Sequence, residues 1–229
     1  MNRVGRALRV AVGVTAVGAL GAGCALFAES FEPQGGKAVA AREAAARAVE
    51  QWLDAIVGDT REHGRLRADA CHEGQDNWKR TDPNAWECRV GVAAVVDGAA
   101  ARSEVVPALE ALHGRLVAAG CQPRLGRGLL DVARDYWTPL SSRAGYGPED
   151  LPFQYYMCPD DSQVEVLSSA PGAPTLARDV ADPFGSGFAG EIRISSEPLA
   201  ADALASATSS SAAQLFVLRV TRAYYTIEN

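Results

Sequence analysis

The sequence has little of what marks a protein that binds nucleic acids or nucleotides. It carries 22 basic against 28 acidic residues, a formal net charge of −6, and lysine only at Lys37 and Lys79. It contains no P-loop, no dinucleotide-binding fingerprint and no Gly-x-Ser-x-Gly nucleophile elbow. An acidic chain disfavours a surface that attracts phosphate groups. We therefore expect no nucleic-acid partner and no cofactor.

Long hydrophobic runs and paired metal-binding cysteines are also missing. The apolar stretch from Val10 to Gly23 has about 14 residues, fewer than the roughly 20 that a membrane-spanning helix needs. No Cys-x-x-Cys pair occurs, and Asp160-Asp161-Ser162 lacks the later glycine and glutamate of an EF-hand loop. The sequence therefore predicts no metal centre.

The overall composition is that of a globular protein. Hydrophobic residues make up 48% of the 229 residues and charged residues 22%. The 22 glycines and 12 prolines follow no collagen-like period, and no repeat has the period of a solenoid or propeller. This length suffices for one well-packed domain and is short for two large ones.

The first 24 residues resemble the signal peptide of bacterial lipoproteins. A basic start with Arg3, Arg6 and Arg9 precedes the apolar run, and Leu20-Gly21-Ala22-Gly23-Cys24 is similar to a lipobox. This family usually has leucine three positions before the cysteine, where this chain has Gly21. The resemblance implies that residues 1–23 are removed and that Cys24 receives a diacylglyceryl group and fatty acids such as palmitate.

The alternative for Cys24 is a chance thiol after a signal peptide that is cut later, at Ala25 or Ala28. The cysteine count favours acylation, since an even number then remains for an oxidising compartment: Cys71, Cys88, Cys121 and Cys158. Two acyl chains hold a protein stably, at about 0.8 kcal/mol for each buried methylene. The resemblance therefore implies a membrane partner, reached through the lipid anchor on the outer face of the cytoplasmic membrane.

The mature chain reads as a flexible tether, residues 24–36, followed by a single domain, residues 37–229. Apolar residues recur at helical spacing over residues 37–58 and again from Ser103, the expected N-cap, to Gly120. Residues 128–137 fit a short helix slightly better than a strand, and residues 198–213 fit a loop with a helical turn. Strands are expected at residues 88–96, 163–167, 190–195 and 214–227.

This order of elements predicts an α+β fold. Two main helices would form a two-layer sandwich on a mainly antiparallel sheet of about four strands, stapled by disulfides. The arginine-rich, lysine-poor and alanine-rich chain is typical of a high-G+C genome, such as that of an actinobacterium. The mature region resembles small α+β lipoproteins of actinobacteria without assigned function, and this resemblance implies no site.

The four remaining thiols permit three pairings. Pairing neighbours, Cys71 with Cys88 and Cys121 with Cys158, gives the simplest topology and closes two loop-rich stretches, each at roughly 3–4 kcal/mol. The rival interpretation is a metal site made by Cys71, His72 and Cys88. We disfavour it because exported thiols are normally oxidised.

Residues for catalysis are few. His63 is expected in a solvated, charged turn, His72 in a loop beside the disulfide, and His113 within the second helix. The acid pairs Glu149-Asp150 and Asp160-Asp161 are the candidates for two-carboxylate hydrolysis. An extracytoplasmic hydrolase that uses such carboxylates is kept as the alternative function.

Aromatic residues cluster between positions 136 and 156, which hold six of the 16 in the chain: Tyr136, Trp137, Tyr146, Phe153, Tyr155 and Tyr156. Such rings seal a long loop onto a core, and they also bind glycans, lipids or proteins. Sealing is the favoured role. The function predicted from the sequence is a non-catalytic lipoprotein that binds an envelope glycan, lipid or partner protein, with these six residues as candidates for binding.

Overall fold

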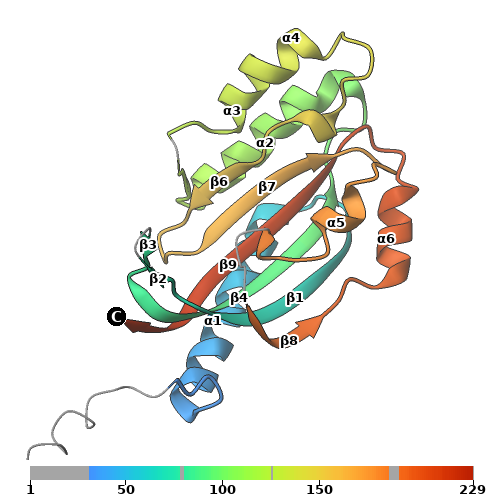
Figure 1. Ribbon diagram of the computed structural model, residues 1–229. Coiled ribbons are helices and arrows are strands. Elements are labelled where there is room, and N and C mark those ends of the chain that lie inside the picture. Colours follow the sequence, from blue (N-terminus) through green and yellow to red (C-terminus); the bar gives the residue numbers. More distant parts are fainter. Residues whose placement is uncertain (1–30, 78–79, 125, 186–190, 229) are drawn as a thin grey trace, which may run out of the picture. The chain divides into compact units, whose positions relative to one another are not determined.

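The computed structural model describes residues 31–77, 80–124, 126–185 and 191–228 (Figure 1). The predicted signal peptide and Cys24 lie outside these residues. Glu32–Asn229 form one compact unit. None of the helices in the described part of the chain is both long enough and apolar enough to cross a membrane.

A seven-stranded antiparallel sheet with the order β5-β6-β7-β9-β4-β1-β8 forms the centre of this unit. Its strands are β1 (Glu62–Glu73), β4 (Asn84–Asp97), β5 (Gln122–Pro123), β6 (Gln154–Met157), β7 (Gln163–Ser169), β8 (Ile192–Glu197) and β9 (Leu215–Glu228). Between β1 and β4, β2 (Asp76–Asn77) and β3 (Arg80–Thr81) pair separately. The predicted α+β class and antiparallel sheet are confirmed, but the expected four strands are too few.

Strand β1 was not predicted because its apolar positions are mostly alanines, which have low strand propensity. Leu66, Ala68 and Ala70 are buried, whereas Arg65 and Arg67, at the alternate positions, are partly exposed. The strand pairs with β4 on one side and with β8 on the other. The expectation of a solvated turn near position 63 and of a loop at position 72 is therefore wrong, since both histidines lie within this strand.

Helices α1 (Gly36–Val57) and α2 (Val105–Ala118) cover one face of the sheet, as their periodicity predicted. Residues 128–137 are helical as α3 (Leu129–Val132) and the π-helical turn η2 (Ala133–Trp137), followed by α4 (Thr138–Leu140). Short 3-10 turns form η1 (Arg102–Glu104) and η3 (Pro148–Asp150). Ser103 lies inside η1 and does not cap α2, whose N-cap is Glu104.

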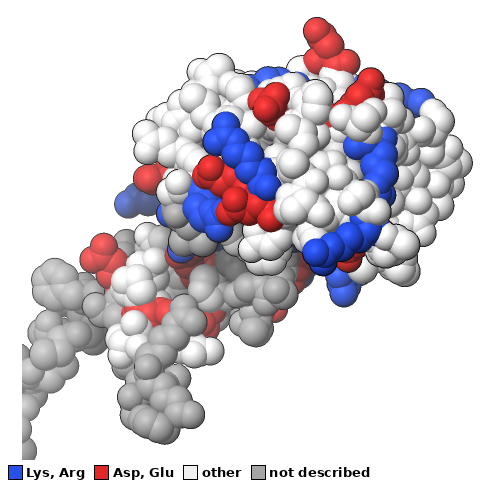
Figure 2. All heavy atoms as spheres, turned by 90° about the horizontal axis from the view of Figure 1, so that it is seen from above, with Lys and Arg blue, Asp and Glu red and all other residues white. Residues whose placement is uncertain are grey.

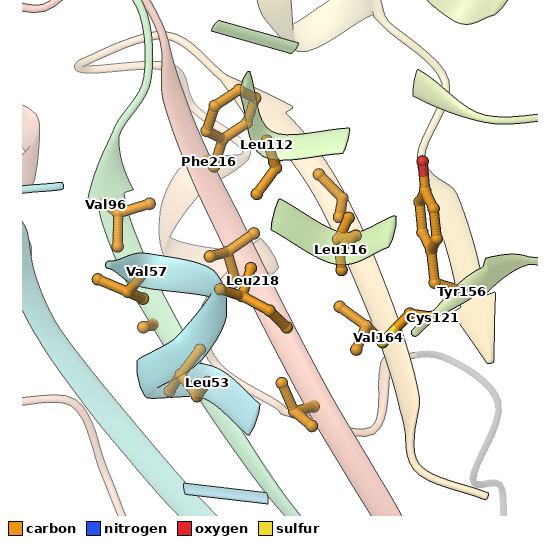
Figure 3. Close-up of a cluster of buried hydrophobic side chains, with 14 of the residues drawn as sticks. Leu53, Val57, Val96, Leu112, Leu116, Cys121, Tyr156, Val164, Phe216 and Leu218 are labelled. Atoms are coloured by element: carbon orange, nitrogen blue, oxygen red, sulfur yellow. The ribbon is translucent and has the colours of Figure 1, made fainter. Parts of the chain in front are cut away.

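The main core lies between these helices and the sheet (Figure 3). Leu53 of α1 and Leu112 and Leu116 of α2 are buried against Phe216 and Leu218 of β9. Because successive residues of a strand point to opposite faces, Leu215 and Val217 of β9 point the other way. They belong to a second apolar cluster on the opposite face.

That second cluster is covered by α5 (Leu176–Asp179) and α6 (Ala201–Thr208), through Leu176, Val180 and Ala207. The helical turn expected within residues 198–213 is thus confirmed. The predicted two-layer arrangement is incomplete, however, because short helices also cover part of the second face of the sheet (Figure 1).

Both predicted disulfides are present, Cys71–Cys88 and Cys121–Cys158. Cys71 and Cys88 are directly opposed on β1 and β4, so the bond joins neighbouring strands instead of tying down a free loop. Cys121 and Cys158 flank the first residue pair of β5 and β6. A metal site at Cys71, His72 and Cys88 is ruled out because both thiols are consumed.

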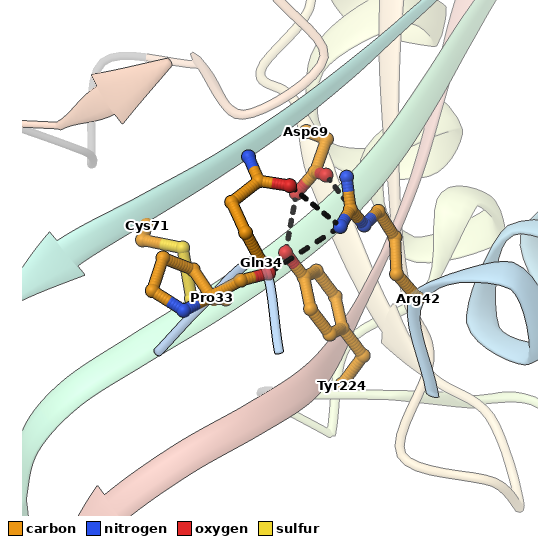
Figure 4. The surroundings of a disulfide bond; sticks show 7 residues. Pro33, Gln34, Arg42, Asp69, Cys71 and Tyr224 are labelled. Carbon is orange, nitrogen blue, oxygen red and sulfur yellow. Dashed lines mark hydrogen bonds and ion pairs between the residues drawn. A yellow bond between two sulfur atoms is a disulfide. The ribbon is translucent and has the colours of Figure 1, made fainter. Parts of the chain in front are cut away.

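Part of the predicted tether contacts the domain. Arg42 of α1 donates a hydrogen bond from Nη2 to the Pro33 carbonyl, at 3.3 Å, and its Nε lies 3.3 Å from Asp69 Oδ2 (Figure 4). Tyr224 donates to Asp69 Oδ1 at 2.8 Å. Burial raises the pKa of the Asp69 carboxyl, although Tyr224 and Arg42 act in the opposite direction. Pro33 and Gln34, in the last part of the predicted tether, are therefore in contact with α1.

Candidate functional site

A cavity of about 570 Å³ lies on the second face of the sheet, beyond the part that α5 covers. Along β9, Leu215 and Val217 lie under the helices, and the next residues on the same face, Arg219 and Thr221, line the cavity. Its other lining residues come from β1, β4, β6, β7 and the segments beside them: His72, Asp82, Pro83, Asn84, Glu87, Arg89, Arg124, Tyr155, Gln163, Glu165, Pro183 and Phe184.

One row of the cavity floor runs across three strands. Tyr155 of β6 is paired with Glu165 of β7, which is paired with Arg219 of β9. Arg219 is buried and donates to Glu165 Oε2 at 2.7 Å and to the Asp179 carbonyl. Burial, together with the neighbouring Glu165, raises the pKa of the Tyr155 hydroxyl, so it stays protonated as a hydrogen-bond donor.

The next row is Gln163, Thr221 and Gly91, from β7, β9 and β4. A Cβ atom on Gly91 would lie 3.0 Å from Phe184 Cε1 and 3.1 Å from Pro183 Cβ. The absence of a side chain at position 91 therefore allows Pro183 and Phe184 to pack directly against the sheet, where they form an apolar wall of the cavity.

The lining residues from the first half of β4 and the segment before it are mostly polar. Arg89 donates from Nε to Glu87 Oε1, and Asn84 donates from Nδ2 to Glu87 Oε2 at 3.1 Å. Asp82 Oδ2 accepts the backbone N–H of Gln75 at 2.9 Å. Glu87 is thus neutralised by an arginine in the same manner as Glu165.

Arg124 differs from the other two arginines of the cavity. Its backbone N–H donates to the Tyr155 carbonyl at 2.9 Å, which fixes the residue at the cavity edge, and its side chain is exposed. Among the residues that the structure describes, no ion pair involves Arg124. Its positive charge is one of three in the lining, which also holds the three carboxylates of Asp82, Glu87 and Glu165.

The six aromatic candidates do not form one surface. Trp137 is 3% exposed, and Tyr156 is fully buried, with its hydroxyl 2.8 Å from His113 Nδ1 and accepting the Leu129 N–H. Tyr146 is partly buried against Trp137, whereas Tyr136 and Phe153 are 39% and 53% exposed. Of the six, Tyr155 alone lines the large cavity.

A smaller hollow of about 380 Å³ lies beside Trp137. The Arg102 guanidinium stands 4.7 Å from the centroid of the Trp137 ring and donates to the carbonyls of Ser141 and Tyr146. These contacts hold the 141–146 loop against the core. Trp137, Tyr146 and Tyr156 therefore have the sealing role that the sequence favoured.

His63, Asp97 and Ser206 have the residue types of a catalytic triad. His63 Nδ1 lies 2.9 Å from Ser206 Oγ, and its Nε2 lies 2.8 Å from Asp97 Oδ1. The imidazole is fully buried, however, and neither cavity is lined by any of the three side chains. The cluster links α6 to β1 and β4, and we assign it a structural role.

The acid pairs singled out from the sequence lie outside the cavity. Glu149 and Asp150 are exposed in η3, and Asp160 forms an ion pair with Arg222 at 2.6 Å. Within the described ranges, no three His, Cys, Asp or Glu side chains are grouped to hold a metal ion. On the face seen in Figure 2, the described residues carry both charge signs in small groups on a mainly uncharged surface.

Sequence reasoning missed the cavity, although one signal was present. Arg219 interrupts the apolar strand Phe216–Val220, and a buried arginine requires partners. Those partners, on β7 and at Asp179, become visible only after the strands are paired. In comparisons with known proteins, the chain matches no protein-family model, no curated protein and no solved structure.

Proposed function

We propose that this protein is a membrane-anchored, non-catalytic lipoprotein that binds a small polar component of the cell envelope in the cavity on the second face of its sheet. The observation that carries this proposal is the cavity itself, whose charged lining residues are three arginines, Arg89, Arg124 and Arg219, and three carboxylates, Asp82, Glu87 and Glu165. Its volume lies within the roughly 300–1,000 Å³ of small-molecule sites.

The cysteines support export. Every cysteine in the described part of the chain is paired, as Cys71–Cys88 and Cys121–Cys158, and disulfides persist in oxidising compartments. Cys24 is thereby left as the odd thiol, at the position that the lipobox-like sequence assigns to acylation. Both features favour a domain held by lipid outside the cytoplasm.

The chemistry of the lining favours a polar ligand over a lipid. Burying charged and amide groups against an acyl chain would cost their hydration without new hydrogen bonds. Arg89, Glu87, Glu165 and Gln163 are among the many polar residues of the lining, and Phe184 with Pro183 supplies a limited apolar wall. Among the three envelope partners that the sequence allowed, a glycan component therefore fits best.

Charge reversal at the cavity edge tests the proposal. The full-length chain is incubated with an extract of envelope small molecules, and the retained compounds are measured by native mass spectrometry. Arg124→Glu should lose the retained compound, while Arg134→Glu, an exposed arginine of η2 outside the cavity, should retain it. Equal retention by both variants would contradict the assignment of the cavity as the binding site.

The hydrolase alternative retains one supporting observation, since Glu87 and Glu165 line the same cavity. Each of them already accepts a hydrogen bond from an arginine, however, and the carboxylate pairs proposed from the sequence lie elsewhere. Incubation with envelope glycans and measurement of new reducing ends decides between the two. If the chain produces new reducing ends and Glu165→Gln abolishes them, the function is hydrolysis and the binding proposal is wrong.

A further inference from the structure

We propose that the cavity recognises an uncharged saccharide, whose hydroxyl groups bind the side chains of Gln163 and Thr221. This inference rests on the proposed function and names the ligand class of the same site. It follows from three properties of the cavity, namely two polar side chains without protein partners, a balanced set of charges and a position on the face of the sheet.

Gln163 and Thr221 are neighbours on the cavity floor, and their side chains keep free hydrogen-bonding groups. The two residues are paired between β7 and β9, and both line the cavity. Thr221 is only 9% exposed, and within the described part of the chain neither the Thr221 hydroxyl nor the Gln163 side-chain amide has a hydrogen-bond partner. A nearly buried hydroxyl at a cavity, without a partner in the protein, is a group that a ligand can satisfy.

The chemistry of this pair favours hydroxyl groups on the ligand. The Thr221 hydroxyl both donates and accepts hydrogen bonds, and the Gln163 amide offers an oxygen acceptor and two N–H donors. A ligand group that only accepts would leave the acceptors of both side chains unused. Neighbouring hydroxyl groups of a sugar both donate and accept, so one sugar ring can satisfy both side chains.

The charges of the lining favour a ligand without net charge. The charged side chains of the lining are three arginines and three carboxylates: Arg89, Arg124, Arg219, Asp82, Glu87 and Glu165. Two pairs of them are in contact, Arg219 with Glu165 at 2.7 Å and Arg89 with Glu87. A charged ligand would give up its hydration and leave a net charge in the cavity, whereas hydroxyl groups lose only hydrogen bonds that the lining replaces.

The place of the cavity on the sheet favours a sugar over an extended peptide. A peptide that adds a strand needs the free N–H and C=O groups of a sheet edge. Strands β7, β9 and β4 are paired with one another under the cavity, so the floor presents side chains instead of backbone groups. Pro183 and Phe184, packed over Gly91, add an apolar wall that suits the C–H face of a sugar ring.

Two sets of three sugars test the inference, because the members of each set share a ring and differ in charge. D-glucose is compared with D-glucuronate and D-glucosamine, and D-galactose with D-galacturonate and D-galactosamine, by calorimetric titration of the purified full-length chain in a detergent without a sugar headgroup. At least one neutral sugar should bind about tenfold more tightly than both of its charged relatives, since an unpartnered charge in the cavity loses its hydration. Equal or tighter binding of a charged member in both sets, or no binding of either neutral sugar, would overturn the inference.

Two substitutions test the named side chains. Thr221→Val keeps the shape and removes the hydroxyl, and Gln163→Leu removes the amide, so each should weaken binding of the neutral sugar about two- to tenfold, the range for one hydrogen bond. Because the Thr221 hydroxyl has no partner among the described residues, urea unfolding should show no loss of stability in Thr221→Val. Thr226→Val and Gln122→Leu, at exposed positions outside the cavity, are the controls and should keep the affinity. Unchanged affinity in both Thr221→Val and Gln163→Leu would overturn the inference.

The extract experiment separates the failure of this inference from the failure of the proposed function. If Arg124→Glu loses a retained compound whose mass identifies it as a peptide or a charged sugar, the ligand class is wrong and the proposed function stands. If no neutral sugar binds and Arg124→Glu changes no retained compound, both fail.

Discussion

His63 Nε2 lies 2.8 Å from Asp97 Oδ1 across two neighbouring strands, and Ser206 of α6 contacts the other nitrogen of the same ring. Ser210 adds a second hydroxyl, which donates to Asp97 at 2.9 Å. One ring nitrogen therefore joins α6 to the sheet, and the other joins β1 to β4. A buried polar cluster of this kind contributes to stability because every member has a partner.

The structural assignment of this cluster predicts a stability effect without a functional one. Ser206→Ala removes one hydrogen bond to a buried imidazole, so the free energy of unfolding should fall by about 1 kcal/mol. Urea denaturation measures this change, with the exposed Ser142→Ala as control. Ligand retention and any hydrolytic activity should not change. Loss of a hydrolytic activity in Ser206→Ala would identify the cluster as catalytic.

Asp69 predicts a specific dependence of stability on pH. Burial raises the pKa of its carboxyl in the folded state above the ordinary value of about 3.9. The folded state therefore binds the proton more tightly than the unfolded state, so stability falls as the pH rises from about 4 through the raised pKa. Below about pH 4 Asp69 is protonated in both the folded and the unfolded state, so it does not change the stability there.

Asp69→Asn removes the titrating group and should flatten this part of the stability curve. Denaturation at several pH values, with the exposed Glu149→Gln as control, measures the slope. The variant also loses the charge facing Arg42, which shifts the whole curve without changing its slope. An unchanged slope in Asp69→Asn would mean that other carboxylates cause the acid dependence.

The parts of the fold that could be predicted are those specified by local patterns. The period of apolar residues located α1 and α2, and the apolar character of residues 214–227 located β9. In strand β1 the signal was weak, because Arg65, Arg67 and Asp69 alternate with Leu66 and two alanines, which have low strand propensity. The buried Asp69 is tolerated because Tyr224, 155 residues away, donates to it and because Arg42 lies beside it.

The cavity could not be predicted from local sequence patterns for a related reason. Arg219 lies 54 residues after Glu165, and it joins Tyr155 and Glu165 in one row only through the pairing of β7 with β9. The cysteines were easier, since an even count and short separations limit the choices. The even number of cysteines thus predicted two contacts of the fold, whereas the polar residues did not predict the site.

Trp137 should be important for stability. Its side chain is buried between the core and the Arg102 guanidinium, so Trp137→Ala should lower the free energy of unfolding by roughly 3–5 kcal/mol. Phe153→Ala, at an exposed aromatic residue of the same cluster, should change it by less than about 0.5 kcal/mol. Thermal and urea unfolding test both. A stable Trp137→Ala variant that loses envelope binding would restore the aromatic cluster as a recognition surface.

The anchor assignment predicts a change of location. Replacing Cys24 by Ser removes the acyl acceptor, so the protein should move from the membrane fraction to the soluble fraction. Fractionation and immunoblotting measure this, and the double variant Cys71→Ser/Cys88→Ser serves as a control that keeps the anchor. Full retention of Cys24→Ser in the detergent phase would contradict acylation at this cysteine.

Gly91 connects the fold to the proposed site. A methyl group there would lie 3.0 Å from Phe184 Cε1 and 3.1 Å from Thr221 Cγ2, so Gly91→Ala must displace the wall of the cavity. Overpacking of this kind costs about 1–3 kcal/mol, and the displaced wall should weaken ligand binding as well.

Gly114→Ala is the matched control, since Gly114 lies exposed in α2 with no atom within 4 Å of the added methyl. That substitution should stabilise the protein by about 0.5–1 kcal/mol because alanine favours the helix. Calorimetric titration and urea unfolding of both variants measure affinity and stability separately. Unchanged affinity in a destabilised Gly91→Ala variant would show that Phe184 and Pro183 do not contact the ligand. The ligand would then have to bind through the polar lining residues alone.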